Sequence, residues 1–206
     1  VKSITGVTTI YGGLDADAIN VAHNVAAGAL PGSGNLHGLQ AKLSVYGNEG
    51  IDTLNLDDSE AHVGANDATL TSSKLTGLGM SAAGLEYYSL EYFNLELDDR
   101  SNTVVVRSTS ADTLITANGG DDDFVVGDTD NTLNNIAGTL TLVGGLGSND
   151  LTVKDSGETA DKQGILYSDA LVGLGMTDGI KDGISYTDFT TLALQLGGGS
   201  DDLYID

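Results

Sequence analysis

Glycine and aspartate recur together at a fixed spacing, and this pattern has the most definite chemistry in the sequence. It has the form G-x-G-x-D-x-U, where U is a large aliphatic or aromatic residue, and it is cleanest in GGGSDDL at 197–203. It is followed closely by GNEGIDTL at 47–54, NGGDDDF at 118–124 and GLDADAI at 13–19. Asn102 and Asn149 stand where these turns carry Asp. All of these turns therefore place a side-chain oxygen two residues before U.

Two chemical interpretations of these turns remain open. A glycine-rich turn exposes backbone carbonyls, and one carboxylate per turn would complete an oxygen cage for Ca²⁺, which binds about six to eight oxygens. Alternatively, each Asp or Asn caps its turn by accepting a hydrogen bond from a nearby backbone N–H. On the first interpretation Ca²⁺ is the cofactor, and its candidate ligands are Asp15, Asp17, Asp52, Asp121, Asp122, Asp150 and Asp201.

The sequence predicts no enzymatic activity. Nucleophile–base pairs need His or Cys; the chain has no Cys, and its three histidines, His23, His37 and His62, have no counterparts in the second half. Neither the metalloprotease motif HExxH nor the phosphate loop GxxxxGK(S/T) occurs. Paired carboxylates of the kind that glycosidases use are too frequent here to mark a site. We therefore assign no catalytic residue.

Aromatic residues crowd one segment and suggest a binding surface. Strand alternation over 85–97 would put Tyr88, Leu90 and Tyr92 on one face and Tyr87 on the other. If exposed, Tyr88 and Tyr92 could stack on sugar rings, which makes carbohydrate a candidate ligand. If buried, they belong to the core, where aromatic strand residues usually pack.

The elements that position these residues come in two copies. LTGLGM at 75–80 returns as LVGLGM at 171–176, and LSVYGNEGIDTLNLDD at 43–58 is matched by LTLVGGLGSNDLTVKD at 140–155. We divide the chain into repeat unit 1 at 1–105, with a loop insertion near 22–35, and repeat unit 2 at 106–206. In LTGLGM the glycines predict a tight corner at which backbones approach closely and the Leu and Met side chains point inward.

Short strands dominate both units and predict an all-β fold. β-branched or alternating runs recur between Gly, Asp, Asn and Ser, as at 43–46, 53–56, 90–97 and 103–106. A parallel β-solenoid (β-helix) built of the two tandem repeats fits the recurrent turns, the aliphatic inward positions and the 5% of aromatic residues. The alternative is two antiparallel β-sandwich domains of about 100 residues each.

Charge limits the partners of this chain. Among its 206 residues, 30 are acidic and 8 are Lys or Arg, so the net charge is −22. Nucleic acids and anionic membranes bind basic patches, and we therefore expect no nucleic acid partner. The absence of any run of 18 apolar residues predicts no membrane insertion.

The turns resemble the haemolysin-type (RTX) calcium-binding repeat G-G-x-G-x-D-x-U-x, in which copies lie nine residues apart; here the Asp/Asn positions are 20 to 52 residues apart. The whole unit is similar to the Gly/Asp-rich repeats of about 100 residues in large bacterial surface and secreted proteins, with 164–176 and 183–201 closest. That resemblance implies an extracellular or cell-surface location.

We therefore expect a non-catalytic structural segment of an extracellular filament, sheath, surface layer or adhesin stalk, stiffened by calcium if the turns bind it. Its partners would be neighbouring copies of the same repeat, stacked end to end within one chain or between chains. The alternative is a carbohydrate-binding β-solenoid module of a cell-surface adhesin.

Overall fold

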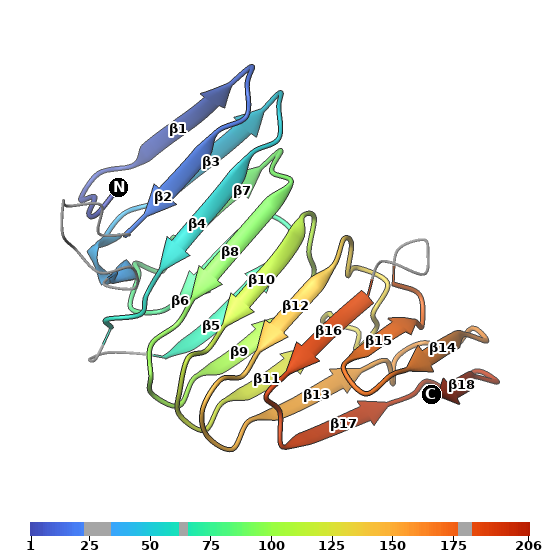
Figure 1. Ribbon diagram of the computed structural model, residues 1–206. Helices are drawn as coiled ribbons and strands as arrows, with labels where there is room; N and C mark the ends of the chain where they lie inside the picture. Colours follow the sequence, from blue (N-terminus) through green and yellow to red (C-terminus); the bar gives the residue numbers. More distant parts are fainter. Residues whose placement is uncertain (23–33, 62–65, 177–182) are drawn as a thin grey trace.

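A computed structural model describes residues 1–22, 34–61, 66–176 and 183–206, and in this part the fold is all-β (Figure 1). The strands form two sheets of nine, called here sheet I and sheet II. In spatial order, sheet I contains β1 (Thr8–Gly13), β3 (Leu43–Asn48), β7 (Leu85–Tyr88), β6 (Lys74–Gly77), β5 (Asp67–Thr71), β9 (Thr103–Val106), β11 (Asp123–Val126), β13 (Asp150–Lys154) and β17 (Thr191–Gln195). In spatial order, sheet II contains β2 (Ala18–Val21), β4 (Thr53–Asp57), β8 (Tyr92–Glu96), β10 (Asp112–Thr116), β12 (Leu140–Val143), β16 (Gly183–Thr187), β15 (Ala170–Gly173), β14 (Gln163–Leu166) and β18 (Asp202–Ile205).

The chain crosses between the sheets after most strands, and the crossing strands pair in parallel with strands further along the chain. Figure 1 shows most strands of sheet II running opposite to most of those in sheet I. Parallel pairing rules out the alternative of two antiparallel sandwich domains for the described residues. The strand assignments at 43–46, 53–56 and 103–106 are confirmed.

Alternation within each strand builds the core between the sheets. In sheet II the inward residues of neighbouring strands stack in register. One such column, all of it at most 9% exposed, contains Val21, Leu56, Leu95, Ile115, Leu142 and Tyr186. Columns of this kind bury one apolar side chain per strand over the length of the sheet, which stabilises a stack that has no large central core.

Two antiparallel excursions interrupt the parallel order, β5-β6-β7 in sheet I and β14-β15-β16 in sheet II. The middle strand of each excursion leads into the repeated LxGLGM segment, where Leu78 and Leu174 are fully buried and have φ of 49° and 51°. A Cβ on Gly77 would lie 1.8 Å from the carbonyl oxygen of Asp67. The predicted tight corner with inward leucines is confirmed.

The predicted strand over 90–97 corresponds to β8, which begins two residues later, at Tyr92, and ends at Glu96. Before it, a turn at 89–91, in which Ser89 has φ of 53°, separates β7 in sheet I from β8 in sheet II. The sequence periodicity ran through this turn because residues on both sides alternate in the same phase. Most of the loop insertion near 22–35, including Pro31, lies outside the described residues.

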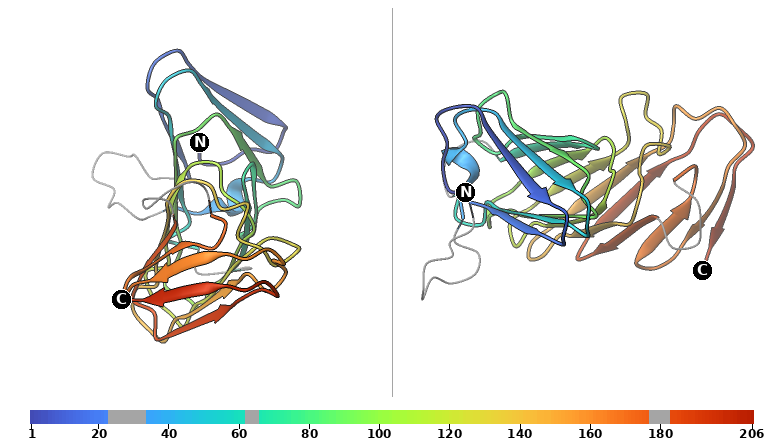
Figure 2. Two further views of the ribbon diagram at one scale, coloured as in Figure 1. Left: turned by 90° about the vertical axis from the view of Figure 1, so that its right-hand side faces the viewer. Right: turned by 90° about the horizontal axis from the view of Figure 1, so that it is seen from above.

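The stack is elongated and its two termini lie at opposite ends (Figure 2). β1 and β2 form one end, and β17 and β18 form the other. The one helical segment in the described residues is a short 3-10 turn, η1 (Leu36–Gly38). No helix among these residues could cross a membrane.

Candidate functional site: side-chain ladders at the turns

The turns between the sheets carry ladders in which each side chain caps the neighbouring turn. In the first ladder, the backbone N–H of Asp17 donates to Oδ1 of Asp52 at 2.8 Å. The N–H of Asp52 donates in turn to Oε2 of Glu91 at 2.7 Å. The bonds join turns that are 35 and 39 residues apart in the sequence but adjacent in the stack. These side chains therefore hold successive turns in register.

A second ladder lies on the opposite side of the stack. The N–H of Asn102 donates to Oδ1 of Asp122 at 2.8 Å, and the N–H of Asp122 donates to Oδ1 of Asn149 at 3.0 Å. The side-chain amide of Asn102 also donates to Oδ1 of Asp122 at 3.2 Å. All three residues are at most 3% exposed. Because Asn serves as well as Asp here, one neutral acceptor oxygen is sufficient for the cap.

The other predicted calcium ligands are spread over the molecule. Oδ1 of Asp201 accepts from the N–H of Lys162 at 3.0 Å, and Oδ1 of Asp121 accepts from that of Ser148 at 2.8 Å. Asp15 and Asp150 are exposed. Among the described residues, no three His, Asp or Glu gather as a metal site would require. The structure thus brings together Asp17 with Asp52 and Asp121 with Asp122, but not all seven.

Two buried carboxylates were missed by the sequence reasoning. Oδ1 of Asp58 accepts from the N–H of Leu36 at 2.7 Å, and Oδ1 of Asp155 accepts from that of Leu133 at 3.2 Å. Donor and acceptor both shift by 97 residues from one bond to the other. The signal was present in the sequence, since LNLDD at 54–58 and LTVKD at 151–155 both end in Asp.

Burial raises the pKa of these carboxyls. The pKa of Asp58 is raised to about 7, mainly by desolvation and further by the charge of Asp98. Desolvation likewise raises the pKa of Asp155 and of Asp122 to about 6 each. Oδ2 of Asp52, Asp122 and Asp155 is buried without a hydrogen-bond partner. Buried oxygens of this kind favour a proton or a cation.

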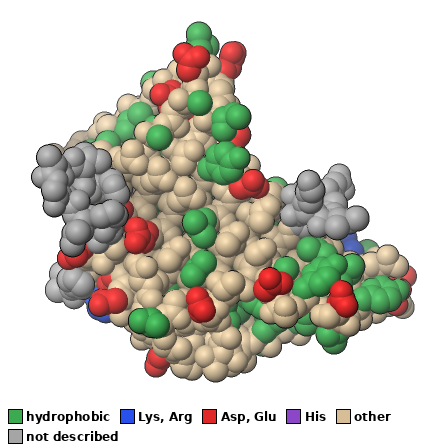
Figure 3. Space-filling view, viewed as in Figure 1, with side chains coloured by type: hydrophobic (Ala, Val, Ile, Leu, Met, Phe, Trp, Pro, Cys, Tyr) green, Lys and Arg blue, Asp and Glu red, His purple; other side chains and the backbone are tan. Residues whose placement is uncertain are grey.

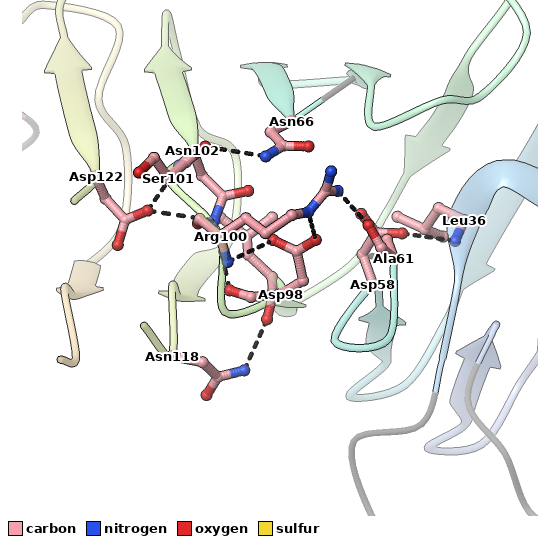
Figure 4. A network of polar contacts seen from close by, with 11 residues as sticks. Leu36, Asp58, Ala61, Asn66, Asp98, Arg100, Ser101, Asn102, Asn118 and Asp122 are labelled. Atoms are coloured by element: carbon pink, nitrogen blue, oxygen red, sulfur yellow. Dashed lines mark hydrogen bonds and ion pairs between the residues drawn. The ribbon is translucent and has the colours of Figure 1, made fainter. Parts of the chain in front are cut away.

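Arg100 forms an ion pair with Asp98, as Figure 4 shows. Its Nε donates to Oδ2 of Asp98 at 2.6 Å, and its backbone N–H donates to Oδ1 of the same residue at 3.1 Å. Its guanidinium also donates to the carbonyl of Ala61. Asp98 is 1% exposed, so this charge-assisted bond is largely shielded from solvent. Arg100 therefore ties the turn after β8 to the turn after β4.

Tyrosines form a column on the outer face of sheet I. Tyr11, Tyr46 and Tyr88 are in register on β1, β3 and β7. Their rings are stacked, with centroids 5.2 Å and 4.9 Å apart. Tyr92 is 44% exposed but lies on β8 in sheet II, so the predicted shared face of Tyr88 and Tyr92 does not exist. Tyr88 and Tyr92 are both exposed, so neither belongs to the core, whereas Tyr87 is buried.

Sheet II has an outer face with polar and apolar depressions. Figure 3 shows acidic side chains scattered over this face and hydrophobic side chains gathered near β14 and β15. An apolar depression of about 320 Å³ there is lined by Ile165, Val172, Met176 and Tyr204. Near β4 and β8, amide side chains hydrogen-bond in a row, from Asn94 to Asn55 at 2.8 Å and from Asn55 to Asn20 at 3.0 Å.

His37 is the one histidine among the residues that the structure describes. His37 is half-buried and its Nε2 has no hydrogen-bond partner. His23 and His62 lie outside the described residues. Comparisons of this chain with protein families, with curated proteins and with solved structures find no match. The functional interpretation therefore rests on the residues and geometry of this chain.

Proposed function

We propose that this chain is a segment of a parallel β-solenoid that serves as a non-catalytic structural repeat. The observation that carries the proposal is the run of buried apolar columns from one end of the stack to the other, ending in strands that pair on one side only. A stack of this kind gains stability by adding units along its axis. The segment belongs to an extracellular or cell-surface filament, sheath, surface layer or adhesin stalk.

The polar groups support a mechanical role. Side chains at the turns bind backbone N–H groups of the next turn, and this cross-links successive layers of the stack. The net charge of −22 keeps neighbouring rods apart laterally, because like charges repel at low ionic strength. Growth is therefore favoured along the axis and disfavoured from the side.

Calcium is part of the proposal as a stiffening ion at the turns. Oδ2 of Asp52 and of Asp122 is buried without a donor, and a hard cation is a good partner for such oxygens. On this proposal, millimolar CaCl₂ raises the melting temperature more than equimolar MgCl₂. Equal shifts with the two salts would leave these residues as turn caps and remove calcium from the function.

Sedimentation velocity and negative-stain electron microscopy test the proposal. With rising protein concentration, the chain should form rods one molecule wide. Ile10→Lys, which places a charge at the inward side of the end strand β1, should shorten them. The matched control is Leu114→Lys, because Leu114 is exposed on a middle strand. Compact monomers at every concentration would contradict the structural role.

The runner-up function is a carbohydrate-binding module of an adhesin, and the tyrosine column favours it. Tyr11 is at one end of this column, stacks on Tyr46 and is 67% exposed. A sugar could stack there. Glycan-array binding that is lost in Tyr11→Ala and kept in Tyr92→Ala would support this function over the structural one.

A further inference from the structure

The strands at the two ends of the stack are paired on one side only. In the described part of the chain, β1 pairs only with β3 and β2 only with β4. At the other end, β17 pairs only with β13 and β18 only with β14. β1, β17 and β18 each leave one row of backbone N–H and C=O groups open. On β2 part of this row is occupied by Val1, whose amino group donates to the carbonyl of Asn20 at 2.9 Å and whose carbonyl accepts from the N–H of Ala22. Rows of this kind are templates for pairing with another strand.

Inward side chains at the ends are less buried than their counterparts inside the molecule. Ile10 on β1 is partly buried, whereas Ile115, at the matching place in the second unit, is fully buried. Leu194 on β17 is partly buried, whereas its counterpart Leu95 is 2% exposed. Both ends therefore expose core positions that a further layer would cover.

The strand order shows how the two units are related. The order β1-β3-β7-β6-β5-β9 in sheet I recurs as β10-β12-β16-β15-β14-β18 in sheet II. Each strand of the first half thus has its counterpart nine strands later, in the opposite sheet. Because the chain crosses between the sheets an odd number of times within one unit, a strand that lies in sheet I in the first unit has its counterpart in sheet II in the second unit. The two halves are related by a half turn about the stacking axis together with a translation along it.

This relation makes the internal junction a template for the ends. Inside the molecule, the first unit meets the second where β8 pairs with β10 and β9 pairs with β11. The counterparts of β8 and β9 are β17 and β18, and the counterparts of β10 and β11 are β1 and β2. Resting on the structural role proposed above, we propose that a second copy of this chain docks with its β1 against β17 and its β2 against β18. Val1 of the second copy bonds Ala22 as Val106 bonds Gly127, so it lies where Ile205 would lie and is displaced on docking.

The template also fixes the register of the docked strands. Leu114 pairs with Asn94 inside the molecule, and the counterpart pair is Thr9 of the second copy with Ala193. Likewise Val125 pairs with Val105, and the counterpart pair is Asn20 of the second copy with Tyr204. Two half turns make a full turn, so sheet I continues as sheet I and sheet II as sheet II.

Apolar side chains match across the proposed contact. Ile10 of the second copy would lie beside Leu194, as Ile115 lies beside Leu95 inside the molecule. Ile19 of the second copy would lie beside Leu203, as Phe124 lies beside Val104. These end residues already pack on the core from one side. Docking would bury their remaining surface, and removal of apolar surface from water drives association.

One pair of side chains across the proposed contact between copies is unfavourable and weakens that contact. Inside the molecule, the amide of Asn102 donates to Oδ1 of Asp122. The counterparts are Asp201 and Asp17 of the second copy, so two carboxylates would face each other at this rung. The position that contributes a hydrogen bond between the two units of one chain thus contributes a repulsion between two chains.

Engineered cysteines test the register, because the chain has no Cys of its own. The variant Thr9→Cys/Ala193→Cys carries two exposed residues at opposite ends of one molecule, so its disulfide can form only between copies. The positive control is Asn94→Cys/Leu114→Cys, which forms the template bond within one molecule. The shifted control is Thr9→Cys/Gln195→Cys, whose Cα atoms would be too far apart to bridge.

Under mild oxidation, we expect a ladder of covalent dimers, trimers and longer polymers for Thr9→Cys/Ala193→Cys, and monomers for the shifted control. Polymers from the shifted control, or dimers from Thr9→Cys alone, would overturn the register while leaving the structural role intact. Rods in the microscope without any Thr9–Ala193 linkage would do the same. Neither rods nor linkage would refute both the docking and the structural role.

A single substitution tests the unfavourable pair. Asp201→Asn restores the Asn–Asp contact of the template and keeps an acceptor for the N–H of Lys162. It should lower the concentration needed for half-association by about tenfold, as expected for a hydrogen bond to a charged group that replaces a repulsion. The control is Asp130→Asn, an exposed carboxylate away from both ends. Equal effects of the two substitutions would overturn the assignment of Asp201 to the contact.

Discussion

Asp58 should make the protein less stable as the pH rises toward neutrality, and Asp58→Asn should remove that loss. Burial raises the pKa of this carboxyl from 3.8 to about 7 in the folded protein. The folded state therefore binds the proton more tightly than the unfolded state does. The stability that comes with protonation is present at low pH and is lost as the pH rises from about 4 to about 7.

The size of the effect follows from the shift. A difference of three pKa units corresponds to about 4 kcal/mol, and on the order of 3 kcal/mol of this falls between pH 5 and pH 8. Asn at this place keeps an oxygen that can accept from the N–H of Leu36, which the structure shows at 2.7 Å. The variant should therefore equal the wild type within about 1 kcal/mol at pH 5 and exceed it at pH 8.

Urea unfolding followed by circular dichroism at pH 5, 6, 7 and 8 measures this difference. Asp130→Asn serves as the matched control, since it removes the same charge from an exposed place. A difference between Asp58→Asn and the wild type that grows with pH, and that Asp130→Asn does not share, is the expected result. A pH-independent loss of stability in Asp58→Asn would refute the reasoning, because Asp58 would then act through its hydrogen bond alone.

Three further substitutions test the packing and the ladders by urea unfolding. Gly77→Ala should cost more than about 2 kcal/mol, since its Cβ would meet the carbonyl of Asp67 at 1.8 Å, whereas Gly6→Ala, with nothing within 4 Å, should change little. Phe93→Ala should cost about 3–5 kcal/mol, because the ring is fully buried and packs against Tyr87 at 4.8 Å; a loss below about 1 kcal/mol would contradict this packing. Asp122→Ala should cost about 1–3 kcal/mol by leaving the N–H of Asn102 without its acceptor, and Asp122→Asn should be tolerated at pH 8; equal losses would show that the charge, and not the cap, is needed.

The sequence was sufficient for the short strands and for the corner at LxGLGM. Alternating residues and turn residues are local signals, and in the stack each strand follows its own alternation. The parallel pairing was favoured over the sandwich by the recurrence of turns. The half-turn relation between the units could not be found in this way, because it depends on the number of crossings between sheets, and periodicity does not reveal on which sheet a strand lies.

The break at Ser89 shows the limit of periodicity. The residues on either side of it alternate as one strand would, but the turn at 89–91, with its left-handed Ser89, separates β7 from β8. For the same reason, Tyr88 and Tyr92 were assigned to one face and lie on different sheets. The buried Asp58 escaped notice because its environment comes from Leu36 and Asp98, which are distant in sequence.

Amide hydrogen exchange at low and high protein concentration tests the central claim of end-to-end stacking most directly. The account predicts that amides of β1, β2, β17 and β18 become protected as concentration rises, since docking pairs their open edges. Amides of the middle strands, such as β9 and β10, should not change. Protection that appears instead on β3 and β7 beneath the tyrosine column, or nowhere at all, would contradict the account.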